Sequence, residues 1–133
     1  MTRYLLDTNI ISDMVRNPVG RAVQHLRKVG DGNICTSIIV ACELRYGCAK
    51  KGSPKLLAKV EDLLATIPVL PLEIPADGEY GGIRAEIEAA GQNIGLNDLL
   101  IAAHSYTLGT TLVTANLGEF SRIRGLKVEN WLG

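Results

Sequence analysis

The sequence lacks the patterns that mark several common classes of protein. Its three cysteines, Cys35, Cys42 and Cys48, show no C-x-x-C spacing, which argues against a disulfide framework and a structural zinc site. No apolar run reaches the roughly 18 residues that a membrane-spanning helix needs. The chain opens directly into a strand-like segment at residues 4–6, without a signal-peptide pattern. We therefore expect a cytoplasmic protein rather than a secreted or membrane protein.

Motifs for nucleotide binding and for familiar hydrolytic sites are also missing. There is no P-loop and no G-x-G-x-x-G, and the two histidines, His25 and His104, belong to no H-E-x-x-H or Ser/His/Asp pattern. We expect His104 to be a helix-surface or packing residue. Cys35 and Cys42 lie among apolar neighbours, so we expect them to be small buried hydrophobes.

What remains is an ordinary globular composition in a chain of 133 residues, with 47% hydrophobic and 21% charged residues. This length suits one domain, which we expect to span residues 1–133. The net charge is zero, but residues 1–60 carry ten Lys/Arg and four Asp/Glu, giving +6, and residues 61–133 carry the reverse, giving −6. Such asymmetry marks either a nucleic-acid or partner face, or simply solvated helix faces.

Strand and helix patterns alternate along the chain, which favours a parallel sheet covered on both faces. We expect strands at residues 4–6, 33–36, 69–72, 111–114 and 127–129. We expect helices at residues 9–17, 19–29, from Ser37 onward, 54–67, 76–90 and 99–108. The strand with Pro71 should lie at an edge, because proline cannot donate to a central ladder. The apolar stripe from Leu56 to Ile67 is expected to pack in the core, with partner contact as the alternative.

Four acidic residues, far apart in the sequence, share one kind of position. Each lies at or just past the carboxyl end of an expected strand, or in the helix that follows: Asp7, Glu43, Asp98 and Glu119. In an open α/β sheet such positions gather in one crevice. Carboxylates gathered there repel each other unless a cation lies between them, and Mg²⁺ commonly bridges carboxylates to phosphates. The pattern therefore points to metal-dependent phosphate chemistry.

Each acid also has an ordinary structural explanation. Asp7 and Asp98 precede or begin helices, where a carboxylate caps the helix or interacts with its dipole. Glu43 lies amid apolar residues, where a carboxylate needs a partner; a salt bridge to Arg45 or Arg84, or simple exposure on a narrow polar strip, would explain it without a metal. The fourth acid is expected in a loop, where most acids are merely solvated. Only the joint placement of the four favours a site.

Four short segments carry a combined pattern over nearly the whole chain. They read Y-L-L-D-T-N at 4–9, S-x₄-C-E-L-x-Y-G at 37–47, G-x-x-D-x-x-I-A-A-H at 95–104 and V-T-x-N-x-x-E-F at 113–120. In order and spacing they resemble the PIN-domain ribonucleases, in particular the VapC-type toxins of bacterial toxin–antitoxin pairs. The resemblance implies a three-layer α/β/α sandwich around a short, mainly parallel sheet.

The resemblance also implies roles for individual residues. The four acids would be catalytic, and Asp7, Glu43 and Asp98 would hold Mg²⁺ or Mn²⁺. Neighbouring polar residues would hold water or the scissile phosphate: Thr8, Asn9, Ser37, Thr114 and Asn116. Three positions depart from the usual family residues: Leu96, Gly118 and Asn116. Basic residues of the first half would steer the RNA backbone: Arg45, Lys50, Lys51 and Lys55.

The implied function is a metal-dependent endoribonuclease that cuts tRNA or another structured RNA as the toxin of a type II toxin–antitoxin system. Its expected partners are RNA, a small antitoxin protein and a second copy of itself. The alternative is a degenerate PIN-like module that binds RNA or protein without cleavage, although all four acids are present. A phosphatase is less consistent, because Asn9 stands where its second Asp would be needed.

Overall fold

The structure is a computed structural model that describes residues 2–133. Its centre is a five-stranded sheet in which every neighbouring pair is parallel, with the order β3-β2-β1-β4-β5. The strands are β1 (Tyr4–Leu6), β2 (Ile34–Ser37), β3 (Val69–Leu70), β4 (Thr111–Val113) and β5 (Val128–Glu129). All five expected strands are present. Strand β3 lies at one edge of the sheet and ends before Pro71, which has no N–H to continue the ladder.

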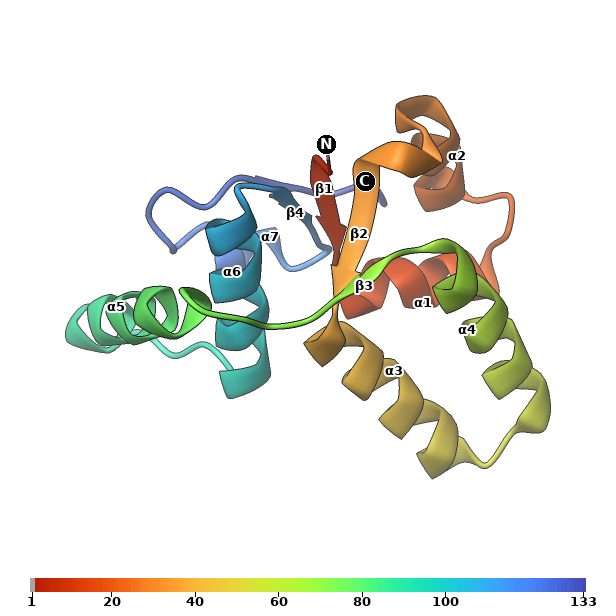
Figure 1. Cartoon of the computed structure of the whole chain (residues 1–133), viewed down its shortest axis with the longest axis horizontal. Coiled ribbons are helices and arrows are strands. Elements are labelled where there is room, and N and C mark those ends of the chain that lie inside the picture. The colour runs from red at the N-terminus through yellow and green to blue at the C-terminus, as the bar shows by residue number, and fades with distance from the viewer. Residues whose placement is uncertain (1) are drawn as a thin grey trace.

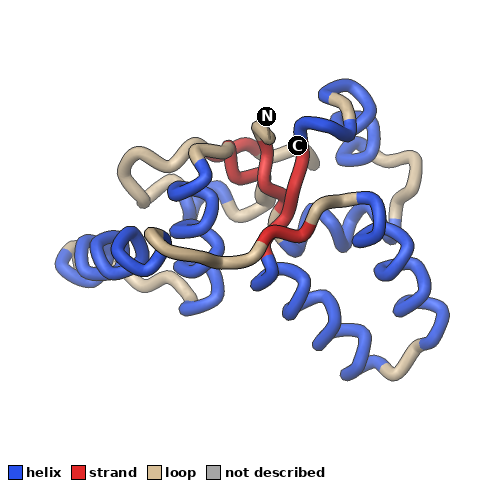
Figure 2. Tube along the Cα trace, viewed as in Figure 1, coloured by secondary structure: helices blue, strands red, loops and turns tan. Residues whose placement is uncertain are grey.

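Helices cover this sheet on both sides, which confirms the α/β/α architecture. They are α1 (Thr8–Arg16), α2 (Arg21–Val29), α3 (Ile38–Lys51), α4 (Pro54–Thr66), α5 (Ala76–Ala89), α6 (Leu96–Leu108) and α7 (Leu117–Phe120), with a 3-10 turn at Asp31–Asn33. In Figure 1 the strands lie between α5 and α6 on the left and α1, α2 and α4 on the right. Figure 2 shows how little of the chain is strand compared with helix. Among residues 2–133, no helix combines the length and the apolar character that crossing a bilayer requires.

Local sequence signals set the helix ends around the site. Ser37 closes β2 and caps α3, because its hydroxyl accepts a hydrogen bond from the Ile39 N–H at 3.1 Å. Gly52 ends α3 with a φ of 64°, a left-handed conformation that glycine adopts without strain. Ser53 then caps α4, and Pro54 occupies its first turn as expected. These caps fix where α3 leaves the sheet.

The strand order creates a crevice next to β1. After β1 the chain passes through α1 and α2 to β2 on one side, and only later returns through α5 and α6 to β4 on the other side. In such sheets the crevice outside the carboxyl ends of the strands is where ligands bind. Leu6 is in register with Val113, and the Asp7 N–H donates to the Val113 carbonyl at 2.9 Å. The first residue after β1 therefore lies beside the end of β4.

The core lies around these two strands. Leu5 and Leu6 of β1 and Leu112 and Val113 of β4 are fully buried. This pattern is typical of parallel strands covered by helices on both faces. Phe120, the sole phenylalanine, is also fully buried and anchors the segment after β4.

The C-terminal segment is held against the sheet by aromatic packing. Trp131 is buried, and its ring meets Tyr4 edge-on at 5.4 Å between centroids and stacks on His25 at 5.4 Å. Such ring pairs add to the free energy gained by burial itself. Trp131 therefore anchors the C-terminal segment by packing.

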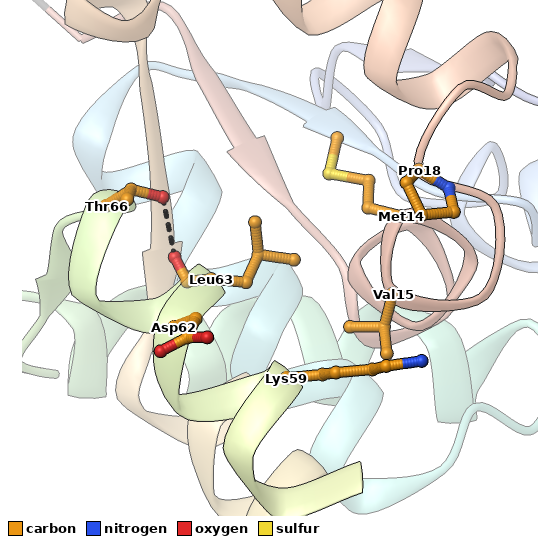
Figure 3. Close-up of a pocket in the computed structure, with 7 residues that line it drawn as sticks. All are labelled: Met14, Val15, Pro18, Lys59, Asp62, Leu63 and Thr66. Atoms are coloured by element: carbon orange, nitrogen blue, oxygen red, sulfur yellow. Dashed lines mark hydrogen bonds between the residues drawn. The ribbon is translucent and has the colours of Figure 1, made fainter. Parts of the chain in front are cut away.

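The stripe from Leu56 to Ile67 divides between two environments. Val60, Leu64 and Ile67 are buried in the core, as expected. Leu63 instead lines an opening of about 320 Å³ between α1 and α4, together with Met14 and Val15 of α1. Figure 3 shows these apolar side chains from the two helices, with Lys59 and Asp62 at the same opening.

Three local expectations were wrong. Helix α6 begins at Leu96 rather than near Leu99, so Asp98 lies in its first turn and makes no capping hydrogen bond as an N-cap would. Glu119 lies in the short helix α7 rather than in a loop. Cys42 is exposed, whereas Cys35 is buried as expected. On α3 the buried side chains near Cys42 are those of Ala41 and Leu44, which leaves Cys42 on the outward face.

Candidate functional site

Asp7 is the buried centre of the crevice. Its side chain is only 3% exposed and caps α1 by accepting a hydrogen bond from the Thr8 N–H at 2.7 Å. The Thr114 hydroxyl donates to Asp7 Oδ2 at 2.8 Å, and the Asn9 amide lies 3.5 Å from the same oxygen. The capping role expected from the sequence is therefore real, and it holds the carboxylate at the junction of β1 and β4.

Thr8 connects Asp7 to the next acid. Its backbone N–H donates to Asp7, and its hydroxyl donates to Glu43 Oε1 at 2.5 Å. Because Thr8 is the first residue of α1 and Glu43 lies on α3, this one residue fixes the two helices and the two carboxylates relative to each other.

Glu43 has no basic partner among the described residues, 2–133. The two salt bridges that could have explained it form elsewhere, because Arg45 pairs with Glu61 and Arg84 pairs with Glu88. Glu43 is half-buried on α3 and faces the crevice through its bond with Thr8. Glu43 thus keeps a carboxylate oxygen available to a cation from outside the chain.

Asp98 and Glu119 complete the acidic group from the other side of the crevice. Asp98 is half-buried in the first turn of α6, and Glu119 on α7 accepts a hydrogen bond from the Gly95 N–H at 3.4 Å. Asp98 and Glu43 line the same open cavity of about 370 Å³. The structure thus brings together all four acids from four different elements of the chain.

Burial, together with mutual repulsion, raises the pKa values of two of the site carboxylates. Burial raises the pKa of Asp98 to about 7, assisted by the negative charges of Glu119, Asp7 and Glu43 and by a hydrogen bond to Glu119. Burial also raises the pKa of Asp7, although the hydrogen bonds from Thr114 and Thr8 oppose this. In the absence of a cation, the cluster therefore retains protons that isolated carboxylates would lose.

This donor set fits a hydrated Mg²⁺ or Mn²⁺ ion. Within residues 2–133, no three His, Cys, Asp or Glu side chains converge closely enough to enclose an ion by themselves. Mg²⁺ does not require such a cage, because it usually keeps several waters and binds one or two carboxylates together with phosphate oxygens. Oxygen-only donors that raise each other's pKa values are suitable for this kind of binding.

Three of the five expected polar neighbours lie on the β4 side of the crevice. Asn9 accepts a hydrogen bond from the Ala115 N–H at 3.0 Å, which ties α1 to the segment after β4. Thr114 is buried and, besides donating to Asp7, accepts from the Asn116 N–H at 3.0 Å. Asn116 itself is exposed beside this group. Their placement is consistent with the expected supporting roles, which stay predictions.

Ser37 joins two helices beside the site. Its side chain is fully buried, accepts from the Ile39 N–H and contacts His104 Nδ1 at 2.8 Å. The hydroxyl therefore links α3 to α6, and its expected role with water or phosphate stays a prediction. His104 is a buried packing residue, and burial lowers the pKa of its ring, which keeps it neutral.

Of the four basic residues expected to steer RNA, Lys51 lines a cavity together with a site carboxylate. That cavity also contains Glu43. Arg45 forms a solvent-exposed ion pair with Glu61, and Lys50 and Lys55 are exposed, so the steering roles of these three residues stay predictions. Arg16 lines the same cavity as Lys51, although it was not among the basic residues expected to contact RNA. The spacing of Thr8, Ser12 and Arg16 by four residues on one helix face could have revealed it.

We expect Thr114→Val to reduce cleavage activity by about 10–100-fold, because it removes the hydroxyl that donates to the Asp7 carboxylate. The change can be measured as the initial rate of RNA cleavage, together with Mn²⁺ affinity by calorimetry. Thr110→Val is the matched control, since Thr110 is also buried and hydrogen-bonded but lies at the other end of β4. Equal losses in both variants would contradict a role for Thr114 at the site.

Two departures from the family pattern are compatible with the local geometry. Leu96 is the first residue of α6, a position where proline and leucine are both accepted. Gly118 lies on α7 with open space around its missing Cβ, so nothing in the surrounding packing demands or excludes a larger residue. Neither departure alters the placement of Asp98 or Glu119.

Comparisons with known proteins agree with this geometry. The family described as PIN domain matches residues 4–126. The chain is 36% identical over 135 residues to "Ribonuclease VapC2" of Haemophilus influenzae, covering 99% of this chain and 100% of that protein. It is 35% identical over 132 residues to "tRNA(fMet)-specific endonuclease VapC" of Shigella flexneri, covering 98% and 99%.

A solved structure is similarly close. The crystal structure of VapBC2 from Rickettsia felis bound to a DNA fragment from their promoter contains a chain that superposes with a TM-score of 0.90 at 35% identity. The match covers 98% of this chain and 99% of that one. The likeness therefore extends over the whole fold, including all four elements that carry the acids.

Proposed function

The chain belongs to the PIN-domain family, and we infer that it is an endoribonuclease of the VapC type, the toxin of a type II toxin–antitoxin system. The relatives named as ribonucleases and tRNA(fMet)-specific endonucleases match it over nearly their full length. The single observation that carries the proposal is the group of four acids around one crevice, without a basic partner for Glu43 in the described chain.

We further propose that cleavage requires Mg²⁺ or Mn²⁺, held by Asp7, Glu43 and Asp98 directly or through water. Bound there, the ion would supply positive charge against the phosphate and lower the pKa of a water molecule. The chain's own residues position the acids: Thr114 and Thr8 orient Asp7, and Thr8 also orients Glu43. We assign Glu119, with Asn116, to positioning either the attacking water or a second metal ion.

The proposal is tested by incubating purified protein with total tRNA and Mg²⁺ or Mn²⁺, with and without EDTA. We expect discrete fragments with the metal and intact tRNA with EDTA. A synthetic substrate carrying a 2′-deoxyribose at the cut site should still be cleaved, because water rather than the 2′-hydroxyl attacks the phosphorus. Loss of cleavage with the 2′-deoxy substrate would contradict this mechanism.

The same experiment distinguishes the non-cutting alternative from the proposed ribonuclease. A degenerate module would leave tRNA and other structured RNAs intact under all conditions and would show no carboxylate-dependent Mn²⁺ binding in a titration. If Mn²⁺ binds and the tRNA pool stays intact, ribosomal RNA is the next substrate to test.

We propose two protein partners. The first is a small antitoxin, because the solved neighbours include the VapBC complexes of Rickettsia felis and Salmonella typhimurium. The second is another copy of this chain, which light scattering of the purified protein would detect as a doubled mass. We also propose that the single domain of residues 1–133 acts in the cytoplasm, where RNA substrates and the antitoxin are accessible.

A further inference from the structure

A second cavity begins at the catalytic carboxylates and leads away from them. It has a volume of about 290 Å³ and lies between α1, α3 and α4. Glu43, which belongs to the carboxylate group, and Thr8, which donates a hydrogen bond to it, are among its lining residues. It is therefore continuous with the proposed cleavage site rather than a separate hollow.

The two helices that form its walls repeat the same order of side chains. On α1 the wall residues Thr8, Ser12 and Arg16 follow each other at intervals of four. On α3 the wall residues Glu43, Gly47 and Lys51 do the same. Residues four apart lie on one helix face, and eight residues extend about 12 Å along the axis. Both walls thus run from the catalytic group to a basic residue.

The floor of the cavity is apolar. Leu44 and Cys48 of α3, Leu56 and Val60 of α4 and Val15 of α1 contribute to it. Glu43 is the only acid that lines it among the described residues, and Arg16 and Lys51 are the bases. An apolar floor with positive charge at one end fits a group that combines a flat ring with an anion.

The neighbouring opening in Figure 3 differs in chemistry, although Val15 lines both. It carries one base and one acid, Lys59 and Asp62, and contains no member of the carboxylate group. Its charge therefore does not favour an anion. Of the two hollows, the cavity between α1, α3 and α4 is the one suited to nucleic acid.

We propose that this cavity is a subsite for the nucleotide next to the scissile phosphate of single-stranded RNA. The base would lie on the apolar floor against the planar Arg16 guanidinium, and the flanking phosphate would meet Arg16 and Lys51. The inference rests on the proposed ribonuclease function. It adds that the enzyme requires an unpaired nucleotide at this position, because a paired base cannot enter such a cavity.

Gly47 offers a direct test. It lines the cavity, and a Cβ at this position meets no atom within 4 Å, so Gly47→Leu fills the cavity without a clash at the backbone. Gly82→Leu on α5 is the matched control, because it lies within a helix and has equally open space but is remote from the cavity. Both substitutions should raise thermal stability, since glycine is unfavourable within a helix.

The measurement is KM for the tRNA cut in the cleavage assay, together with the binding of a fluorescent 12-nucleotide single-stranded RNA in an Asp98→Asn background with Mg²⁺. We expect Gly47→Leu to weaken RNA binding and raise KM by about tenfold or more, the scale of one lost base contact. Gly82→Leu should leave both values unchanged. Gly47→Ala provides a smaller blocking group if the leucine variant does not fold.

The basic residues give a second readout. The double variant Arg16→Gln/Lys51→Gln should lower the slope of log affinity against log salt by about one unit. The double variant Arg27→Gln/Lys28→Gln removes the same charge from α2, far from the crevice, and should leave the slope unchanged. Equal slopes in the two double variants would overturn the phosphate assignment.

The outcomes separate this inference from the function on which it rests. If the wild-type protein cuts RNA and Gly47→Leu binds and cuts equally well, the subsite is wrong and the ribonuclease stands. If Gly47→Leu keeps its RNA affinity but no longer forms a complex with a co-expressed antitoxin, the cavity belongs to a protein partner and the proposal is overturned. If the wild-type protein cuts no RNA, the proposed function itself fails.

Discussion

Replacing Asp7 by Asn is expected to lower RNA cleavage by more than about 100-fold, beyond the loss expected for residues that only support a metal ligand. The variant should remain folded. Asparagine caps helices about as well as aspartate, and its carbonyl can still accept from the Thr8 N–H. The Thr114 hydroxyl, which now donates to the carboxylate, can instead accept from the new amide.

Cleavage rates and thermal unfolding of the purified variant measure both parts of this prediction. Asp98→Asn should give the same loss of cleavage, because it removes a second carboxylate of the group. Asp77→Asn is the charge-matched control, since Asp77 is exposed in the first turn of α5 and remote from the crevice. Full cleavage by both crevice variants would contradict the catalytic assignment. An unfolded Asp7→Asn variant would show only that the Asp7 cap of α1 is essential for folding.

The second large effect concerns pH and metal. The stability of the metal-free protein should fall as pH rises from about 4 to about 7, because the folded pKa of Asp98 is about 7 and its ordinary value is 3.8. An acid whose folded pKa is raised binds more protons in the folded state, so its effect is absent below the ordinary pKa. The destabilisation grows between the two pKa values and is complete above pH 7. The raised pKa of Asp7 acts in the same direction.

Thermal melts in EDTA between pH 5 and pH 8 would test this dependence. Asp98→Asn should flatten the profile, because the substituted side chain no longer titrates. Mg²⁺ should raise the melting temperature more at pH 8 than at pH 5. At pH 8, a concentration of 100 Kd should add about 2.7 kcal/mol to the free energy of unfolding. If the wild-type profile matches that of Asp98→Asn, the folded protein does not raise the pKa of Asp98, and the prediction is wrong.

The parts of this fold that the sequence predicted share a simple physical basis. Short apolar segments alternate with helical patterns, and the rule that carboxyl ends of parallel strands share one edge placed Asp7 beside the end of β4. Helix caps at Ser37 and Ser53 could be found because capping depends on residues only two or three apart.

The parts that the sequence did not predict depend on contacts between distant residues. The contact between Ser37 and His104 joins residues 67 positions apart, and nothing in the local sequence indicates that the two side chains meet. Arg45 looked free until α4 brought Glu61 beside it. Asp98 was expected as a cap or a first-turn residue, and it is a first-turn residue because α6 begins at Leu96 rather than near Leu99. Helix ends are the least certain boundaries in any sequence.

The bond between Thr114 and Asp7 joins residues 107 positions apart, and this separation has a consequence for the timing of activity during synthesis. Chains are made from the N-terminus, so Asp7 and Glu43 leave the ribosome long before Thr114 and Glu119 have been added. An incomplete chain cannot hold Asp7 in place or gather all four acids. The ribosome that translates this protein, and the tRNAs it uses, therefore meet an active nuclease only when the chain is nearly finished.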